Sequence, residues 1–135
     1  DIDYFKKIND DYGHEAGDEV LRSISQELKI VVRQQDIVGR LGGEEFMVVL
    51  PECDLTQAIN IAERCRYHIE SLDIILKNKE CIHVTASFGV AVSRFHQSMD
   101  EVFVLADKAL YLSKEKGRNC VHHYLELIDM IDLQF

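Results

Sequence analysis

The sequence predicts an α+β fold, in which helices pack on a mostly antiparallel β-sheet. Apolar residues recur at helical spacing in three separate segments, and runs rich in β-forming residues lie between them. One pair of glycines separates two such runs, as in a hairpin, and a hairpin combined with crossover connections is typical of an α+β sandwich. With 135 residues, 47% of them hydrophobic, the chain is long enough to form one domain with its own core.

The first third of the chain is expected to hold the end of a strand and two helices. Residues 1–3 are interpreted as the strand end, and residues 5–12 as a short helical turn that stops at Gly13. A longer helix is expected over residues 18–33, because apolar residues recur there at helical spacing: Val20, Leu21, Ile24, Leu28 and Val31.

A hairpin is expected next, with strands at residues 37–41 and 46–50. Gly42 and Gly43 lie between them and can adopt the positive φ angles that tight turns require. Pro51 ends the second strand.

The second half of the chain is expected to form a helix at residues 56–71, a strand at 82–92, a third helix and a short strand at 120–124. Ser98 and Glu101 have the spacing of a capping box at the start of the third helix, and Gly117 is expected to close it.

The composition excludes some classes of function. The net charge of −9 argues against a protein that coats nucleic acid, because phosphate backbones require a basic surface. It does not exclude a nucleotide site, since carboxylates can hold a divalent cation that binds phosphates. The four cysteines include no CxxC pair, so free thiols in a reducing cytoplasm are expected rather than a zinc site or disulfides. No apolar run is long enough to span a membrane, and we expect a cytoplasmic domain, whether or not its parent protein is membrane-anchored.

The most informative stretch, LGGEEF at residues 41–46, places Glu44 and Glu45 at the tip of the expected hairpin. As an isolated string it is typical of a solvated turn. Asp1 and Asp3, however, form a second carboxylate pair at the end of another strand. If the two strands are neighbours, Asp1 and one of the glutamates can share a divalent cation. Mg²⁺ suits this arrangement, because it takes few carboxylates and keeps positions for phosphates and water.

Two further pairs of residues are ambiguous from their spacing. Asn9 and Asp18 can read a guanine edge, although spacing alone favours the capping of a turn and of a helix. Lys114 and Arg118, four positions apart, either clamp phosphates from one helix face or offset the negative end of the helix dipole. The sequence contains no GxxxxGK loop, which excludes a P-loop nucleotide fold.

Taken together, the strings DIDYFKKINDDYGH, RLGGEEF, VTASFGVA, ADKALY and KEKGRN closely resemble the signature of GGDEF domains, the catalytic domains of diguanylate cyclases. The resemblance runs from Asp1 to about Val121, and GGEEF is a variant found in active members of the family. It implies a palm-like sheet similar to that of nucleotidyl cyclases. It also implies a homodimer that condenses two GTP molecules into cyclic di-GMP and pyrophosphate, with Mg²⁺ or Mn²⁺ as cofactor.

Matching positions carry the family's functional residues onto this sequence. The metal ligands are implied to be Asp1, Glu44 and the carbonyl of Ile2, with Glu45 near the metal, where it would help to deprotonate the attacking hydroxyl. The residues implied to bind GTP are Asn9 and Asp18 for the guanine, and Phe5, Lys6, Lys114 and Arg118 along the phosphates; Gly42 and Gly43 are also expected to bind the substrate.

Arg33 and Asp36 form an RxxD pair shortly before the hairpin. As a bare string this pair would be an i,i+3 salt bridge. By resemblance it matches an inhibitory site, where cyclic di-GMP binds as a stacked dimer, and Arg64 matches the second arginine of that site. We favour the inhibitory site, since arginine suits guanine and phosphate edges.

The sequence departs from the family at both ends. A family domain begins earlier, with a helix and the first part of the metal-bearing strand, so residues 1–124 are expected to form an N-terminally truncated GGDEF domain. The tail at residues 125–135 is rich in apolar residues, and we expect it to be ordered and to cover apolar surface.

The resemblance also implies an upstream sensor or receiver domain as partner. The alternative function is a catalytically silent module that binds GTP or cyclic di-GMP and signals through a partner. Because every matched catalytic position is intact, the sequence favours the enzyme.

Overall fold

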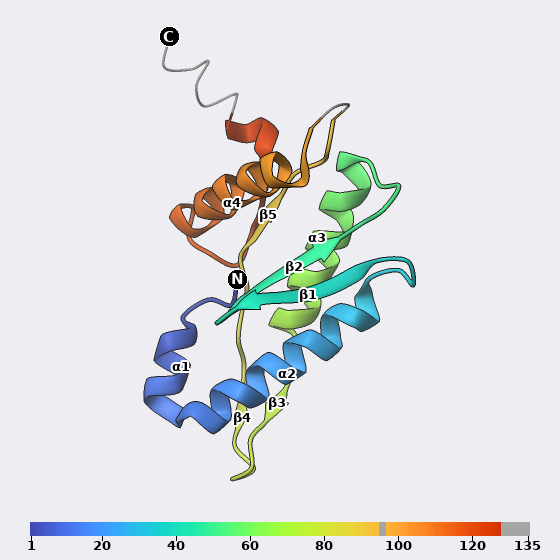
Figure 1. The fold of residues 1–135 in the computed structure, drawn as a ribbon. Coiled ribbons are helices and arrows are strands. Elements are labelled where there is room, and N and C mark those ends of the chain that lie inside the picture. Colours follow the sequence, from blue (N-terminus) through green and yellow to red (C-terminus); the bar gives the residue numbers. More distant parts are fainter. Residues whose placement is uncertain (95–96, 128–135) are drawn as a thin grey trace.

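The computed structural model describes residues 1–94 and 97–127, which fold into four helices packed around short strands (Figure 1). The elements in chain order are α1 (Phe5–Tyr12), α2 (His14–Val31), β1 (Ile37–Gly42), β2 (Glu45–Val49), α3 (Leu55–Glu70), β3 (Ile74–Ile75), β4 (Cys81–Ile82), β5 (Phe88–Val90), α4 (Met99–Glu115) and β6 (Val121–His123). The predicted α+β class, with helices on mostly antiparallel strands, is confirmed.

The four helices lie close to their expected positions, and their starts differ for local reasons. The second helix begins at His14 rather than at residue 18, because Gly13 (φ 91°) separates it from α1 and serves as its N-cap. α3 begins at Leu55, one residue early, because Asp54 and Gln57 form a reciprocal capping box. At the start of α4, the Ser98 hydroxyl accepts a hydrogen bond from the Glu101 amide at 3.2 Å, as the sequence predicts.

The predicted hairpin is confirmed. β1 and β2 pair antiparallel, with Arg40 opposite Phe46 and Gly42 opposite Glu45, and a bulge between Arg40 and Gly42. Gly42 and Gly43 adopt φ angles of 145° and 52°, which favour glycine. The Arg40 Nε donates a hydrogen bond to the Gly43 carbonyl at 2.9 Å and so braces the tip.

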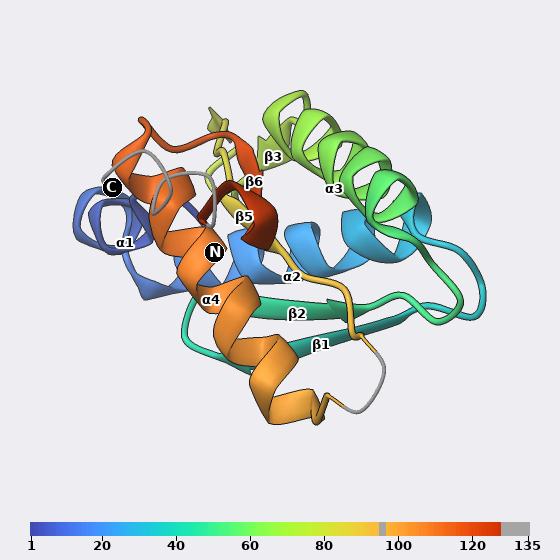
Figure 2. The same ribbon diagram turned by 90° about the horizontal axis from the view of Figure 1, so that it is seen from above.

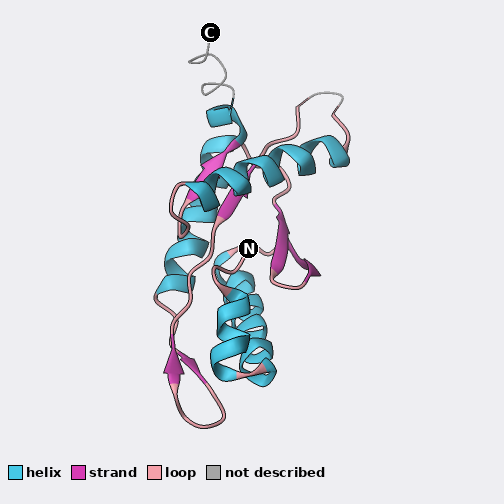
Figure 3. Cartoon of the chain, turned by 90° about the vertical axis from the view of Figure 1, so that its left-hand side faces the viewer, coloured by secondary structure: helices cyan, strands magenta, loops and turns pink. Residues whose placement is uncertain are grey.

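The strands form three separate two-stranded pairs (Figure 3). β3 and β4 are antiparallel, whereas β5 and β6 are parallel, so the strand pairs are mostly but not wholly antiparallel. The prediction of one continuous strand over residues 82–92 is wrong. This segment contains the end of β4, an isolated antiparallel bridge between Ala86 and Ile2, and β5, and each of these parts pairs with a different partner.

The core lies where α2 and α3 pack against the strand segments, and its largest fully buried side chains include Ile2, Ile24, Ile69 and Ile74. β5 runs between α3 and α4 (Figure 2). A Cβ atom at Gly89 would overlap the backbone of α4 at Ala106 and Leu110, so glycine permits this close approach.

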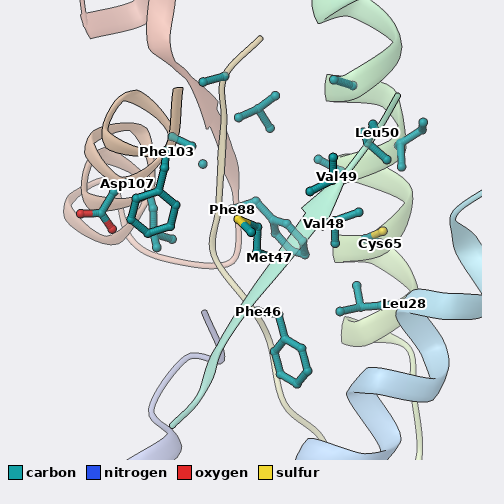
Figure 4. Close-up of a pocket in the computed structure, with 18 of the residues that line it drawn as sticks. Leu28, Phe46, Met47, Val48, Val49, Leu50, Cys65, Phe88, Phe103 and Asp107 are labelled. Atoms are coloured by element: carbon teal, nitrogen blue, oxygen red, sulfur yellow. The ribbon is translucent and has the colours of Figure 1, made fainter. Parts of the chain in front are cut away.

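An apolar cleft of about 520 Å³ separates β2 from β5 (Figure 4). Residues of α3 and α4 complete its walls, and Asp1 and Glu45 lie on its lining. The cleft leaves part of the β2 surface uncovered.

The apolar tail is described only as far as residue 127. Tyr124 is buried, and residues 125–127 are half-buried in a helical turn. The rest of the expected ordered tail, residues 128–135, lies outside the described residues. None of the helices in the described ranges has both the length and the apolar character needed to cross a membrane.

Candidate active site

The N-terminal residues join the tip of the β1–β2 hairpin to the segment before β5. The Ile2 amide donates a hydrogen bond to the Glu44 carbonyl at 3.2 Å. On the other side, residues 1–3 pair with residues 85–87, since the Asp3 amide bonds to the Thr85 carbonyl and the Ser87 amide to the Asp1 carbonyl, each at 2.9 Å. Asp1 and the GGEE tip are therefore neighbours, although residues 1–3 form an isolated bridge rather than the predicted strand end, and Glu44 lies in the turn between β1 and β2.

This pairing makes neighbours of residues whose oxygen atoms Mg²⁺ prefers, although the carboxylates of Asp1, Glu44 and Glu45 are not all within 4.8 Å of one another. The side chain of Asp1 is only 7% exposed, and Glu44 and Glu45 are half-buried. The Ile2 carbonyl follows Asp1 directly in the chain and accepts no hydrogen bond from the described residues. Carboxylates and a free carbonyl at one strand end fit a hard divalent cation that also binds phosphates.

Lys114, in the last turn of α4, reaches the same place. Its Nζ atom lies 3.0 Å from Oδ2 of Asp1, and its side chain is one-third exposed. A cation and a carboxylate that are both mostly withdrawn from water interact more strongly than an exposed pair.

Asp3 has a different environment from Asp1. It is 4% exposed, and its carboxylate accepts hydrogen bonds from the hydroxyls of Ser87 at 2.6 Å and Thr85 at 2.7 Å and from the backbone amide of Asn119 at 3.0 Å. These donors fix the strand and the turn after α4, so Asp3 supports the site structurally.

Arg118 does not lie on α4, and the expectation that it shares a helix face with Lys114 is wrong. The helix ends at Glu115, and the Arg118 amide bonds back to the Ser113 carbonyl at 3.0 Å, as in a Schellman turn through Gly117. Arg118 has φ 63°, and its guanidinium lies over the Tyr4 ring, 4.9 Å from the centroid. The turn therefore carries it toward the N-terminal strand.

A polar network that the sequence did not indicate supports this turn. The Arg66 guanidinium bonds to the side chains of Asn119 at 3.1 Å and Glu70 at 2.8 Å, and Asn119 also donates to Glu70 at 2.7 Å. The hydrogen bond from Asn119, followed by the Arg66 charge, lowers the pKa of Glu70. No local signal in the sequence links Arg66 to residue 119.

Asn9 and Asp18 flank the contact between α1 and α2. A Cβ atom at Gly17 would overlap the Asn9 side-chain oxygen, so glycine allows the amide to lie against α2. Asp18 is exposed one residue further along. Asp18 does not cap α2, because Gly13 is the N-cap, and the capping interpretation is wrong for this residue.

The other residues expected to bind GTP lie on α1 and at the tip of the β1–β2 hairpin. Phe5 begins α1 and packs against the core, while Lys6 is exposed beside it. Gly42 and Gly43 leave the hairpin tip bare of side chains, with open space where a Cβ atom would be.

Arg33 and Asp36 lie just before the hairpin and bind each other. The Arg33 guanidinium contacts both carboxylate oxygens of Asp36 at 2.9–3.2 Å, and donates to the Pro51 carbonyl at 2.7 Å. Burial acts to raise the pKa of Asp36, but the hydrogen bonds from Arg33 outweigh it and hold that pKa below its ordinary value. The i,i+3 salt bridge is thus present, and Arg64 is exposed on α3.

Comparisons with known proteins match this arrangement. The family model described as "Diguanylate cyclase, GGDEF domain" matches residues 1–120. Diguanylate cyclase DosC of Escherichia coli is 41% identical over 90% of the chain. The chain spans between 26% and 34% of the length of the curated relatives first matched.

Solved structures share the fold. The GGDEF domain of DgcB from Caulobacter crescentus, in complex with c-di-GMP, has a TM-score of 0.87 at 33% identity and covers 92% of this chain and 74% of its own. The active GGEEF domain of a diguanylate cyclase from Vibrio cholerae has a TM-score of 0.81 at 34% identity, with 92% and 78% covered. This chain belongs to the GGDEF domain family of diguanylate cyclases.

Proposed function

We propose that this domain is an active diguanylate cyclase, which condenses two GTP molecules into cyclic di-GMP and pyrophosphate across a homodimer. The observation that carries this proposal is the junction of Asp1 with the GGEE hairpin through the Ile2–Glu44 hydrogen bond. Both carboxylate groups are intact and lie at one strand end, beside the cation of Lys114.

Asp1, Glu44 and the carbonyl of Ile2 would hold a divalent cation, Mg²⁺ or Mn²⁺, and Glu45 would lie beside it. At such a site the cation neutralises charge on the transferring phosphoryl group. Glu45 lies on the lining of the cleft together with Asp1. In this position it can accept the proton of the attacking 3′-hydroxyl.

The protein's own cations would orient the nucleotide. Lys114 is already within 3.0 Å of a carboxylate ligand, so it can interact with a phosphate held at the same place. Arg118 approaches from the turn that Asp3 and Asn119 fix. Asn9 and Asp18, on either side of Gly17, would bind the guanine edge.

Product inhibition is proposed at Arg33, Asp36 and Arg64. The Arg33 guanidinium donates hydrogen bonds to the Asp36 carboxylate and the Pro51 carbonyl. Cyclic di-GMP would have to share this guanidinium with Asp36, and the ion pair with Asp36 keeps the guanidinium oriented at the surface. An upstream sensor or receiver domain would set the pairing of two such domains.

The test is to incubate the full-length protein with GTP and Mg²⁺ and to separate the nucleotides by chromatography. Formation of cyclic di-GMP supports the enzyme. Binding of GTP or cyclic di-GMP without turnover would replace the proposal with a silent binding module.

A further inference from the structure

The β3–β4 hairpin projects at one end of the molecule, away from α4 (Figure 1, Figure 3). Ile74 pairs with Ile82, and Ile75 with Cys81, in antiparallel register. Ile74 and Ile82 are 1% and 7% exposed and anchor one face of the hairpin in the core. Since side chains alternate along a strand, the other face presents Ile75, Cys81 and the next cross-strand pair to solvent.

That next pair is Asp73 and His83. Oδ1 of Asp73 lies 2.7 Å from Nε2 of His83, and the ligand atoms of Asp73, Cys81 and His83 all lie within 4.8 Å of one another. In a tetrahedral zinc site with bonds of about 2.0–2.3 Å, ligand atoms lie about 3.5 Å apart. The three side chains therefore need only small rotamer adjustments to share one ion.

The backbone of the hairpin is braced at its turn. The amides of Leu76 and Lys79 bond to the carbonyls of Glu80 and Leu76, each at 2.8 Å, and the Glu80 amide bonds to the Asn78 side chain at 2.9 Å. A braced turn and a buried reverse face hold the two strands in register, which reduces the entropy lost when a ligand binds.

We propose that Asp73, Cys81 and His83 form a surface site for a borderline divalent transition-metal ion, Zn²⁺, with water in the fourth position. The Cys81 sulfur, a His83 ring nitrogen and an Asp73 carboxylate oxygen are the mixed S, N and O donors that such ions favour. Binding releases the thiol proton of Cys81 to water, and the ion replaces the hydrogen bond between Asp73 and His83, whose ring stays neutral with its one proton on the nitrogen that does not bind the ion. This donor set differs from the all-oxygen set of Asp1, Ile2 and Glu44, so the two sites select different ions.

Because the cysteines form no CxxC pair, the sequence alone favours free thiols over a zinc site. The register of the β3–β4 hairpin brings residue 73 opposite residue 83, and this proximity cannot be read from their spacing along the chain.

Other residues of the chain provide matched controls. His68 and Glu27 form a second exposed histidine–carboxylate pair, 3.0 Å apart, that belongs to no such ligand group in the described residues. Burial raises the pKa of the Cys65 thiol to about 11 and that of Cys53 above its ordinary value, so both are weaker competitors for metal. Cys120 lies 3.6 Å from the ring of His122 and is the competing thiol.

The test is a titration of the reduced 135-residue chain with Co²⁺, which reports thiolate ligation by its near-ultraviolet absorption, followed by displacement with Zn²⁺. Excess Mg²⁺ is present throughout to occupy all-oxygen sites. We expect a saturable thiolate band that disappears in Cys81→Ser. We also expect the Co²⁺ affinity to fall about tenfold or more in His83→Gln and in Asp73→Asn.

Cys53→Ser and His68→Gln should leave the band and its midpoint unchanged, with far-ultraviolet circular dichroism as the check on folding. A band that survives Cys81→Ser, or that is lost in Cys120→Ser, would overturn the proposal. Because the readout is absorption rather than turnover, this result is independent of cyclase activity.

Discussion

The Nζ atom of Lys114 lies 3.0 Å from Oδ2 of Asp1, although the two residues are 113 positions apart. This contact joins the end of α4 to the strand that carries the proposed metal ligand. A residue of the proposed phosphate clamp therefore neutralises a residue of the proposed metal site. Binding of a metal–nucleotide complex would exchange this ion pair for contacts of each partner with the ligand.

Lys114→Ala should lower the rate of cyclic di-GMP formation. A hydrogen bond to a charged group contributes about 1.5–3 kcal/mol, which corresponds to about a ten- to hundredfold fall in rate. Mn²⁺ binding without nucleotide, measured by calorimetry, should not weaken, because the substitution removes a cation that competes for Asp1. The exposed Lys108 on the same helix provides the control substitution Lys108→Ala. Normal turnover by Lys114→Ala would contradict the role of this lysine.

Asp1→Asn should mainly reduce metal affinity and turnover, whereas Asp3→Asn should mainly reduce stability. Asp3→Asn leaves at least one of three buried or half-buried donors without its carboxylate acceptor, so the free energy of unfolding should fall by about 1–3 kcal/mol. Asp1→Asn keeps an amide oxygen for Lys114 but loses a metal-binding charge, so it should reduce metal affinity and turnover more than stability. Urea unfolding and Mn²⁺ calorimetry on both variants separate the two effects. Equal loss of stability would show that Asp1 is structural as well.

Arg33→Ala should raise the concentration of cyclic di-GMP needed for inhibition, with little change in the initial rate at low product. The substitution removes a bidentate guanidinium that lies apart from the carboxylate cluster. Arg22, which forms an exposed i,i+3 pair with Glu19 on α2, provides the matched control Arg22→Ala. Unchanged affinity for cyclic di-GMP by calorimetry would leave Arg33 and Asp36 as a plain salt bridge.

Stability should fall in acid because of Asp36. The Asp36 side chain is 0% exposed, and folding lowers its pKa below the ordinary value of 3.8. The stabilisation that this carboxylate provides is therefore complete above the ordinary pKa. That contribution is lost as pH falls through the lower, folded value. Urea unfolding of the wild type should therefore show a decreasing free energy below about pH 4, and Asp36→Asn should show a smaller decrease. An identical pH dependence in the two proteins would contradict this assignment.

The features that the sequence predicted depend on local chemistry. Gly42 and Gly43 specify the hairpin through their φ angles, and the apolar spacing of α2 specifies its buried face. Contacts between distant residues account for what was missed. Nothing near Asp3 in the chain indicates that Thr85, Ser87 and Asn119 will surround it. The partition of residues 82–92 among different partners likewise depends on which strands lie beside them.

The central claim is that the GGEE hairpin and Asp1 form one metal site for cyclic di-GMP synthesis. The most direct measurement compares cyclic di-GMP formation from GTP and Mg²⁺ by the full-length wild type and by Glu44→Gln, with Glu80→Gln at the exposed β3–β4 turn as control. Glu44 lies in a turn and is half-buried, so Glu44→Gln should change the free energy of unfolding of the domain by no more than about 0.5 kcal/mol. Unfolding should therefore not explain a loss of rate. The account predicts that Glu44→Gln abolishes product formation while Glu80→Gln preserves it. Synthesis at the wild-type rate by Glu44→Gln would contradict it.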